Sequence, residues 1–336
     1  MGQRRGAKVT RGWLDSEGIG VSFVSRLARL SPRRLLHSVD EVERLHRKVH
    51  GLETRVRQLV AAHESTEKTL EQLRTALAAF DPDRIRCHVE GAIAAAPLAS
   101  EPFPHVVIDR LLPETAYHQL VRAIPPRVFF EHLDLNHQEV TVPSDLAPPL
   151  SREIWAAFYD RVVTEALVPG LVDKFREPLD RLVSRYWPTH QSLGDANIRL
   201  ELLMSRILLR RPGYAIKPHR DPRWAFVTCL VYLPPVRAQQ FFGTQLCSVR
   251  REPEHRSHGA LWMDDTDVEV VKSVPGHPNT ALAFVNGTGA HRASIPDDVA
   301  FDTERYLYQL QLGPSVASQR RLLASMPADE VARWRR

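Results

Sequence analysis

Apolar residues recur every seven positions along one stretch near the start of the chain, and this repeat restricts the stretch to a long helix. One position of the repeat holds Val42, Val49, Val56, His63, Leu70 and Leu77. The other holds Leu45, Leu52, Leu59, Thr66, Leu73 and Phe80. A heptad spacing kept this long is typical of a coiled-coil seam, whereas a helix of a globular core has a wider apolar stripe. We therefore expect a coiled-coil helix over residues 38–80.

The residue types within the seam favour one arrangement of partner chains. Valine at the first position with leucine at the second is typical of a parallel, two-stranded coil. His63 and Thr66 interrupt the seam and are candidates for setting its register, and Lys48 and Glu53 stand where the side chains of two chains pair. We expect a homodimer through residues 42–80, the alternative being an amphipathic helix that packs on its own domain.

The positive charge of the chain is confined to its first residues. The formal net charge is +5, and residues 1–40 contain eight basic and three acidic side chains, so the rest of the chain is neutral. A neutral body does not favour duplex nucleic acid as a partner. We expect residues 1–37 to form a basic, disordered tail. Peripheral contact with a membrane surface and a mitochondrial leader are the alternatives for this tail.

Composition bounds the class of protein and its compartment. The apolar fraction of 43% is enough for a core, and no apolar run approaches the roughly 18 residues that a membrane-spanning helix needs. The cysteines Cys87, Cys229 and Cys247 form no closely spaced pair, which excludes a disulfide framework and a zinc ribbon. A cytoplasmic location is therefore expected.

The body of the chain is predicted to begin near residue 103. Asp81-Pro82-Asp83 is expected to end the long helix, and residues 81–102 are expected to form a linker. Residues 113–124 and 151–187 have helical patterns, whereas residues 125–150 contain five prolines and are expected to be loops. The final residues, 316–336, have the pattern of a short amphipathic helix.

Short strands separated by turns make up the second half of this body. They are predicted at residues 199–210, 215–219, 224–233, 244–249, 268–274, 280–285, 290–295 and 306–312. Short strands after a helical lead-in favour a mainly β, α+β domain over residues 103–315. Its core is expected to be a double-sheet jelly roll, or cupin-like barrel.

One constellation among these strands has the residue types of a metal site. His219-Arg220-Asp221 has the form HxD, which alone is weak evidence because His132-Leu133-Asp134 repeats it. His219 ends an extended run, so alternation puts it and Asp221 on the same side of the chain. His291, after a later strand and a GTGA turn, is the third candidate. Two imidazoles and one carboxylate are the ligands of non-haem Fe(II) sites with open positions.

A rival ligand set consists of His132, Asp134 and His190, with Arg199 beyond it. His132 and Asp134 fall in a predicted loop, and His190 has no predicted strand before it. The metal is therefore assigned to His219, Asp221 and His291.

The segments around these ligands resemble the Fe(II)- and 2-oxoglutarate-dependent dioxygenases, in particular the bacterial prolyl-hydroxylase-like members. That family's pattern is HxD, a strand, a distal histidine and a late arginine or lysine, here His219, Asp221, His291 and Arg305. The segments EPFPHVVIDRLLP, CLVYLPP, FFGTQLC, ALAFVNGTGAHRAS and ERYLYQLQLG also match. The resemblance covers roughly residues 100–315 and none of residues 1–99.

The resemblance implies a double-stranded β-helix that uses Fe(II), O2 and the cosubstrate 2-oxoglutarate. Arg305 is the implied partner of the far carboxylate of 2-oxoglutarate, with Arg292 as the alternative, and Tyr214 is a candidate to add a hydroxyl. The implied reaction releases succinate and CO2 and oxidises a second substrate. Asp221 implies hydroxylation, because halogenating relatives lack this carboxylate.

Two other functions stay open at this point. One is an interaction protein that pairs through its coiled coil and has an inactive barrel, and the other is a cupin-type metalloenzyme that does not use 2-oxoglutarate. The intact ligand set argues against an inactive barrel, and the late arginine argues against a cupin. The sequence does not indicate the primary substrate, which is either a small molecule or a protein.

Overall fold

The computed structural model describes residues 32–134, 136–234, 241–252, 261–326 and 331, with the side chains described from residue 40 onward. The chain divides into two compact units, Met1–Leu70 and Glu71–Arg336. Most of the predicted basic tail lies outside the described residues, as does much of the predicted carboxy-terminal helix. Within the described residues, no helix combines the length and hydropathy that crossing a bilayer requires.

The predicted long helix is α2 (Pro32–Ala78), which begins six residues before the predicted start at residue 38. In the first unit, its apolar seam is open to solvent. The exposed fraction ranges from 48% at Leu70 to 69% at Leu59. The end of the seam behaves differently, because Phe80 is buried and belongs to the core of the second unit. The predicted coiled-coil segment is therefore too long at its carboxy-terminal end.

The predicted linker over residues 81–102 is wrong for most of its length, because residues Pro82–Ala95 form helix α3. Proline is suited to the first turn of a helix as well as to ending one. Here the Asp81 side chain accepts a hydrogen bond from the backbone N–H of Arg84, at 2.9 Å, and caps the new helix. The helix buries Ile85 and Val89 in the core, so this segment is part of the folded domain.

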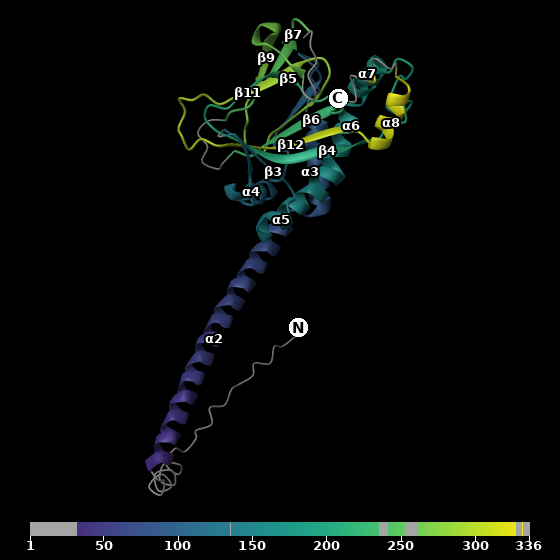
Figure 1. The fold of residues 1–336 in the computed structure, drawn as a ribbon. Coiled ribbons are helices and arrows are strands. Elements are labelled where there is room, and N and C mark those ends of the chain that lie inside the picture. Colours follow the sequence, from purple (N-terminus) through teal and green to yellow (C-terminus); the bar gives the residue numbers. More distant parts are fainter. Residues whose placement is uncertain (1–31, 135, 235–240, 253–260, 327–330, 332–336) are drawn as a thin grey trace. The chain divides into compact units, whose positions relative to one another are not determined.

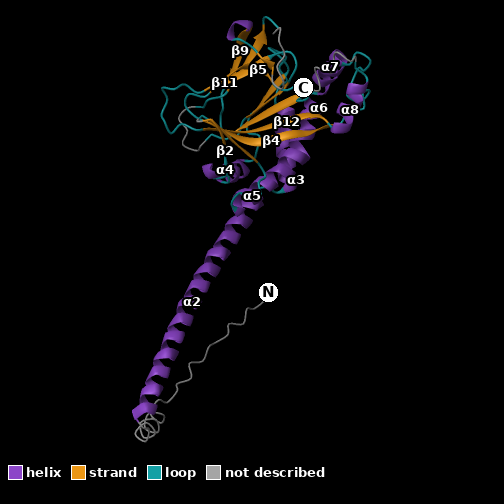
Figure 2. Ribbon diagram, viewed as in Figure 1, coloured by secondary structure: helices purple, strands orange, loops and turns teal. Residues whose placement is uncertain are grey.

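Two antiparallel sheets form the centre of the second unit (Figure 2). In the larger sheet the strand order is β1-β10-β6-β12-β4-β3-β2, and in the smaller it is β8-β5-β11-β7-β9. The strands of the larger sheet are β1 (His105–Ile108), β2 (Glu131–Asp134), β3 (His137–Thr141), β4 (Leu200–Arg210), β6 (Val227–Tyr232), β10 (Ala281–Val285) and β12 (Arg305–Pro314). Those of the smaller sheet are β5 (Ala215–Arg220), β7 (Thr244–Val249), β8 (Leu261–Trp262), β9 (Val268–Val274) and β11 (Ala290–Ser294).

All eight strands predicted between residues 199 and 312 are present, with shifts at their ends. The prediction of loops over residues 125–150 is wrong in part. After a 3₁₀ turn, η1 (Arg127–Phe129), strands β2 and β3 form a hairpin, and β3 pairs with β4 to extend the larger sheet. The prolines of this region lie outside the two strands, so they do not interrupt the ladder.

Helices cover the outer face of the larger sheet (Figure 1). They are α3, α4 (Glu114–Arg122), α5 (Pro149–Ala157), the π-helical segment η2 (Phe158–Leu167), α6 (Val168–Lys174), α7 (Arg176–Tyr186) and α8 (Val316–Ala324). Alternation along β4 points Ile207 and Leu209 into this helical core. Leu208 points to the opposite, inner face, where it joins a cluster with Leu246 of β7. The space between the two sheets is therefore apolar in part, and it also holds the candidate site.

Candidate metal centre

Three ligand-type side chains converge where strands β5 and β11 pair. His219 near the end of β5 lies opposite His291 of β11, and Asp221 directly follows β5. The Nε2 atoms of His219 and His291 lie 3.7 Å and 4.0 Å from Oδ1 of Asp221. One ligand atom from each residue lies within 4.8 Å of the others, and all three side chains are buried. In the part of the chain that the structure describes, no other such group converges in this way.

Hydrogen bonds hold two of these ligands in orientations that suit a metal. Nδ1 of His219 lies 2.9 Å from the carbonyl oxygen of Lys217, which can only accept, so Nδ1 donates and Nε2 is the ring nitrogen left to face a metal. The Thr228 hydroxyl donates to Oδ2 of Asp221 at 2.5 Å and leaves Oδ1 directed at the histidines. Asn286 donates in turn to the Thr228 hydroxyl at 3.0 Å. The donor set is therefore preorganised.

The electrostatics of the site keep His291 neutral. Burial, together with the neighbouring His219, lowers the pKa of His291 to about 3. A neutral imidazole is the form that binds a metal. Two imidazoles and one carboxylate suit a divalent transition metal and leave further coordination positions open. The residues present therefore fit Fe(II), as the sequence predicted.

The rival ligand set is not assembled. His132 lies on β2 with an exposed side chain, and its Nδ1 is 2.9 Å from the side-chain nitrogen of Gln138. His190 instead lies beside Asp195, with 3.6 Å between its Nδ1 and the carboxylate. The repeated HxD motif therefore has no third partner among the described residues.

The metal ligands line a cavity of about 370 Å³ between the two sheets. Arg305, the first residue of β12, lines the same cavity and is 7% exposed. Its Nε donates to the carbonyl of Phe242 at 2.7 Å, and Nη2 donates to Thr244 Oγ1 at 3.2 Å. The hydroxyl of Tyr232 also donates to Thr244 Oγ1, at 3.0 Å. The Arg305 guanidinium and the Thr244 hydroxyl therefore line the cavity together, and Tyr232 supports Thr244 from outside its lining.

Glycine is needed beside Arg305 for this arrangement. A Cβ atom at Gly243 would overlap the carbonyl oxygen of Val274. The close approach of the two backbones lets the Gly243 carbonyl accept a bond from Nη2 of Arg305, at 3.0 Å. The guanidinium is thus fixed by backbone oxygens.

The two alternatives for the cosubstrate contact, Arg292 and Tyr214, line the same cavity and have other partners there. Arg292 lines the cavity but is paired with Asp265, and its Nε donates to Gln245 at 2.7 Å. The ring of Tyr214 lies 4.9 Å from the guanidinium carbon of Arg210. Tyr232, in contrast, lies beside Arg305, with 5.8 Å between the guanidinium carbon and the ring centre. Sequence reasoning missed Tyr232, although its alternation with Thr228 on β6 places both on the inner face.

Comparisons with known proteins give weak likenesses. No family model matches the chain, and no curated protein matches it. A 2OG-Fe(II) oxygenase family oxidoreductase from Burkholderia pseudomallei is 12% identical, covers 62% of this chain and 84% of its own, and gives a TM-score of 0.36. A prolyl-4-hydroxylase from Pseudomonas putida is 12% identical, covers 69% of this chain and 99% of its own, and gives a TM-score of 0.35. HygX from Streptomyces hygroscopicus, with nickel, 2-oxoglutarate and hygromycin B bound, is 13% identical. It covers 63% of this chain and 83% of its own, and gives a TM-score of 0.37. These values are too low to assign a function, which has to come from the geometry of the site.

Proposed function

We propose that this chain is an Fe(II)- and 2-oxoglutarate-dependent dioxygenase built on a double-stranded β-helix, and that it hydroxylates its primary substrate. The observation that supports this most is the cavity itself. Its lining contains a convergent His-Asp-His group and a buried guanidinium without a carboxylate partner among the described residues. A divalent metal on the first and a carboxylate on the second would complete both sets of partners.

The strand register between Thr244 and His291 gives a spacing that suits a five-carbon dicarboxylate. Strand β7 pairs with β11 so that Leu246 lies opposite His291, and Thr244 stands two residues earlier on β7. Two residues along a strand span about 6.6 Å. Arg305, which binds Thr244, is therefore displaced from the metal ligands by about two residues along the direction of β7. This supports Arg305 rather than Arg292 as the residue that binds the far carboxylate of 2-oxoglutarate.

The chain's own residues would bind, orient and exclude water. His219, Asp221 and His291 would hold the iron, and Thr228 would keep the carboxylate of Asp221 turned toward it. Bound iron would supply the activation of O2 and the oxidative conversion of 2-oxoglutarate to succinate and CO2. Because Thr244 Oγ1 already accepts bonds from Arg305 and Tyr232, its own proton is free to be donated to a bound carboxylate.

Removing the guanidinium tests this assignment. Replacing Arg305 by Gln should weaken 2-oxoglutarate binding by roughly ten- to hundred-fold and leave metal binding unchanged, because a hydrogen bond between charged groups contributes about 1.5–3 kcal/mol. Calorimetric titration of the Mn(II)-loaded protein with 2-oxoglutarate measures this. Arg292→Gln is the matched control and should bind like wild type. Equal affinity in the Arg305 variant and wild type would overturn the proposed cosubstrate site.

We further propose that the chain forms a parallel homodimer through the exposed part of the α2 seam, residues 42–70. Valine and leucine alternate along it, and every seam residue from Val42 to Leu59 is more than half exposed. In a parallel pair, Lys48 of one chain would meet Glu53 of the other. This contact concerns assembly and is independent of the proposed chemistry.

A further inference from the structure

Four arginines line the cavity that holds the metal ligands, and they fall into two kinds. They are Arg206, Arg210, Arg292 and Arg305. Arg206 is bonded to Glu139, with 2.5 Å between Nη1 and Oε1, and Arg292 is paired with Asp265. Arg210 and Arg305 have no carboxylate within ion-pair distance among the described residues, and they donate instead to carbonyl and hydroxyl oxygens.

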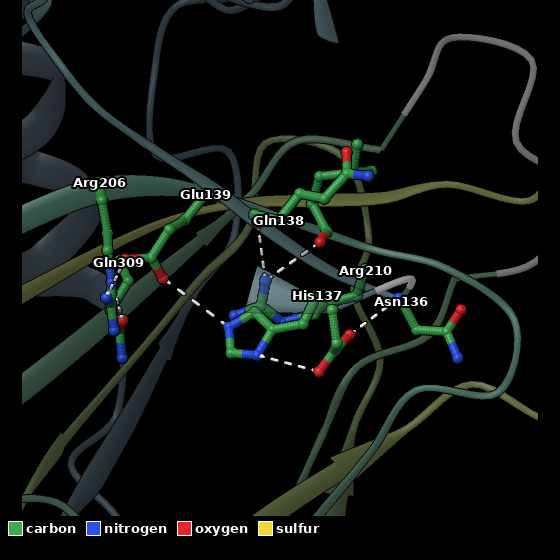
Figure 3. Close-up of polar contacts among 9 residues, drawn as sticks. Asn136, His137, Gln138, Glu139, Arg206, Arg210 and Gln309 are labelled. Atoms are coloured by element: carbon green, nitrogen blue, oxygen red, sulfur yellow. Dashed lines mark hydrogen bonds and ion pairs between the residues drawn. The ribbon is translucent and has the colours of Figure 1, made fainter. Parts of the chain in front are cut away.

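These two guanidinium groups begin at facing positions and then diverge. Arg210 of β4 and Arg305 of β12 are register partners. Arg305 extends toward Thr244 and the ring of Tyr232, on the β6 side of β12. Arg210 extends to the other side, where Nη1 donates to the carbonyl of Gln138 on β3 at 2.8 Å. Figure 3 shows Arg210 beside Gln138 and His137. The cavity is therefore lined by two cationic groups that extend in different directions. A single short anion would bind only one of them.

Arg210 has an unused donor in a buried place. The residue is 3% exposed, and its Nε is buried without a hydrogen-bond partner. Burial lowers the pKa of this guanidinium from its ordinary value, which reflects the free energy cost of an unpaired buried cation. Glu139, an acid that interacts electrostatically with Arg210, is bonded to Arg206 (Figure 3). A bound anion would offset this cost.

Arg210 lines the first cavity together with two aromatic side chains, Tyr214 and Trp262. A second cavity adjoins the first and shares with it His137, Tyr214, Ile216 and Trp262. The Tyr214 ring, which faces the guanidinium of Arg210, thus belongs to both. Trp262 is 45% exposed, and its ring lies 4.9 Å from that of His219. A groove with two aromatic rings therefore leads from Arg210 past the metal ligands.

We propose that Arg210 binds a carboxylate of the primary substrate, and that the substrate is an organic acid whose body lies against Tyr214 and Trp262. The inference rests on the proposed function, because it takes Arg305 as the cation for 2-oxoglutarate. It places two anions in one cavity, each on its own arginine. A guanidinium suits this task because its N–H groups match a carboxylate in two parallel bonds.

Benzoate and benzamide are suitable probes, since they share a ring and a planar head group but differ in charge. Each is titrated by calorimetry into protein that is loaded with Mn(II) and saturated with 2-oxoglutarate. Benzoate should bind roughly ten- to hundred-fold more tightly than benzamide. Arg210→Gln should abolish this difference and keep the affinity for 2-oxoglutarate. Arg210→Lys, which keeps the charge, should retain part of it. Arg211→Gln, a neighbour whose guanidinium lies over Phe301 instead, should behave as wild type.

Three results would overturn the inference. The first is equal binding of the two probes to wild type, which includes binding of neither. The second is a benzoate affinity that Arg210→Gln leaves unchanged. The third is loss of 2-oxoglutarate binding in both Arg210 variants, which would place Arg210 in the cosubstrate site. A wild-type protein that binds no 2-oxoglutarate would refute the proposed function instead, and Arg210-dependent binding of benzoate would still support the anion site.

Discussion

The hydroxyl of Thr228 provides a sensitive test of the metal centre, because it acts on the metal only through Asp221. Thr228 is fully buried, and its hydroxyl donates to Oδ2 of Asp221 at 2.5 Å. Valine has nearly the same shape, so Thr228→Val removes this bond without opening a cavity. A hydrogen bond to a charged group contributes about 1.5–3 kcal/mol, and about 1.4 kcal/mol corresponds to a factor of ten. Metal affinity should therefore fall by roughly ten- to hundred-fold, the range found for partners of metal ligands.

The assay is a competition between the protein and a chelator for Mn(II) at constant pH. Thr244→Val is the matched control, since it makes the same change elsewhere in the cavity lining, where the hydroxyl faces Arg305. This variant should keep wild-type metal affinity and weaken 2-oxoglutarate binding. The reasoning is refuted if Thr228→Val binds Mn(II) as tightly as wild type, or if Thr244→Val loses as much metal affinity as Thr228→Val.

Three further predictions concern assembly and stability. Leu52→Glu should convert a dimer into a 38.2 kDa monomer in sedimentation equilibrium. Gln58→Glu, which lies outside the seam, should leave the dimer intact. An unchanged mass for Leu52→Glu would exclude dimerisation through the α2 seam. Phe80→Ala should lower the free energy of unfolding by about 3–5 kcal/mol, because Phe80 is fully buried. A loss below about 1 kcal/mol, measured by urea titration, would contradict the place of Phe80 in the core. Burial lowers the pKa of His105, so the unfolded chain binds more protons below about pH 6.5, and stability should fall as the pH drops through that value. His105→Gln should flatten this dependence, and an unchanged slope would refute the assignment.

The local part of the metal site could be predicted from the sequence. His219 and Asp221 are two residues apart at the end of an extended run, so alternation alone places them together. His291 follows a strand and a turn, and the predicted strands around it are present. Their meeting depends on the pairing of β5 with β11, which the structure describes; the resemblance implied the ligand set and not this pairing.

The rest of the cavity depends on register across strands, which the sequence does not reveal. Arg210 faces Arg305 because β4 and β12 pair over their whole lengths. Tyr232 reaches Arg305 because β6 lies on the other side of β12. No spacing within any one segment indicates either neighbour. The missed strand β3 has the same cause, since its short HQEVT run acquires its role only through pairing with β4.

The most direct test of the central proposal is an anaerobic titration of the protein with Fe(II) and 2-oxoglutarate, followed by visible absorption. Chelation of the iron by 2-oxoglutarate should produce a weak charge-transfer band in wild type. The band should be absent in His219→Ala, which lacks a metal ligand, and should require more 2-oxoglutarate in Arg305→Gln. A folded wild-type protein that shows no band, or a band of equal strength in His219→Ala, would contradict the assignment of iron and cosubstrate to this cavity.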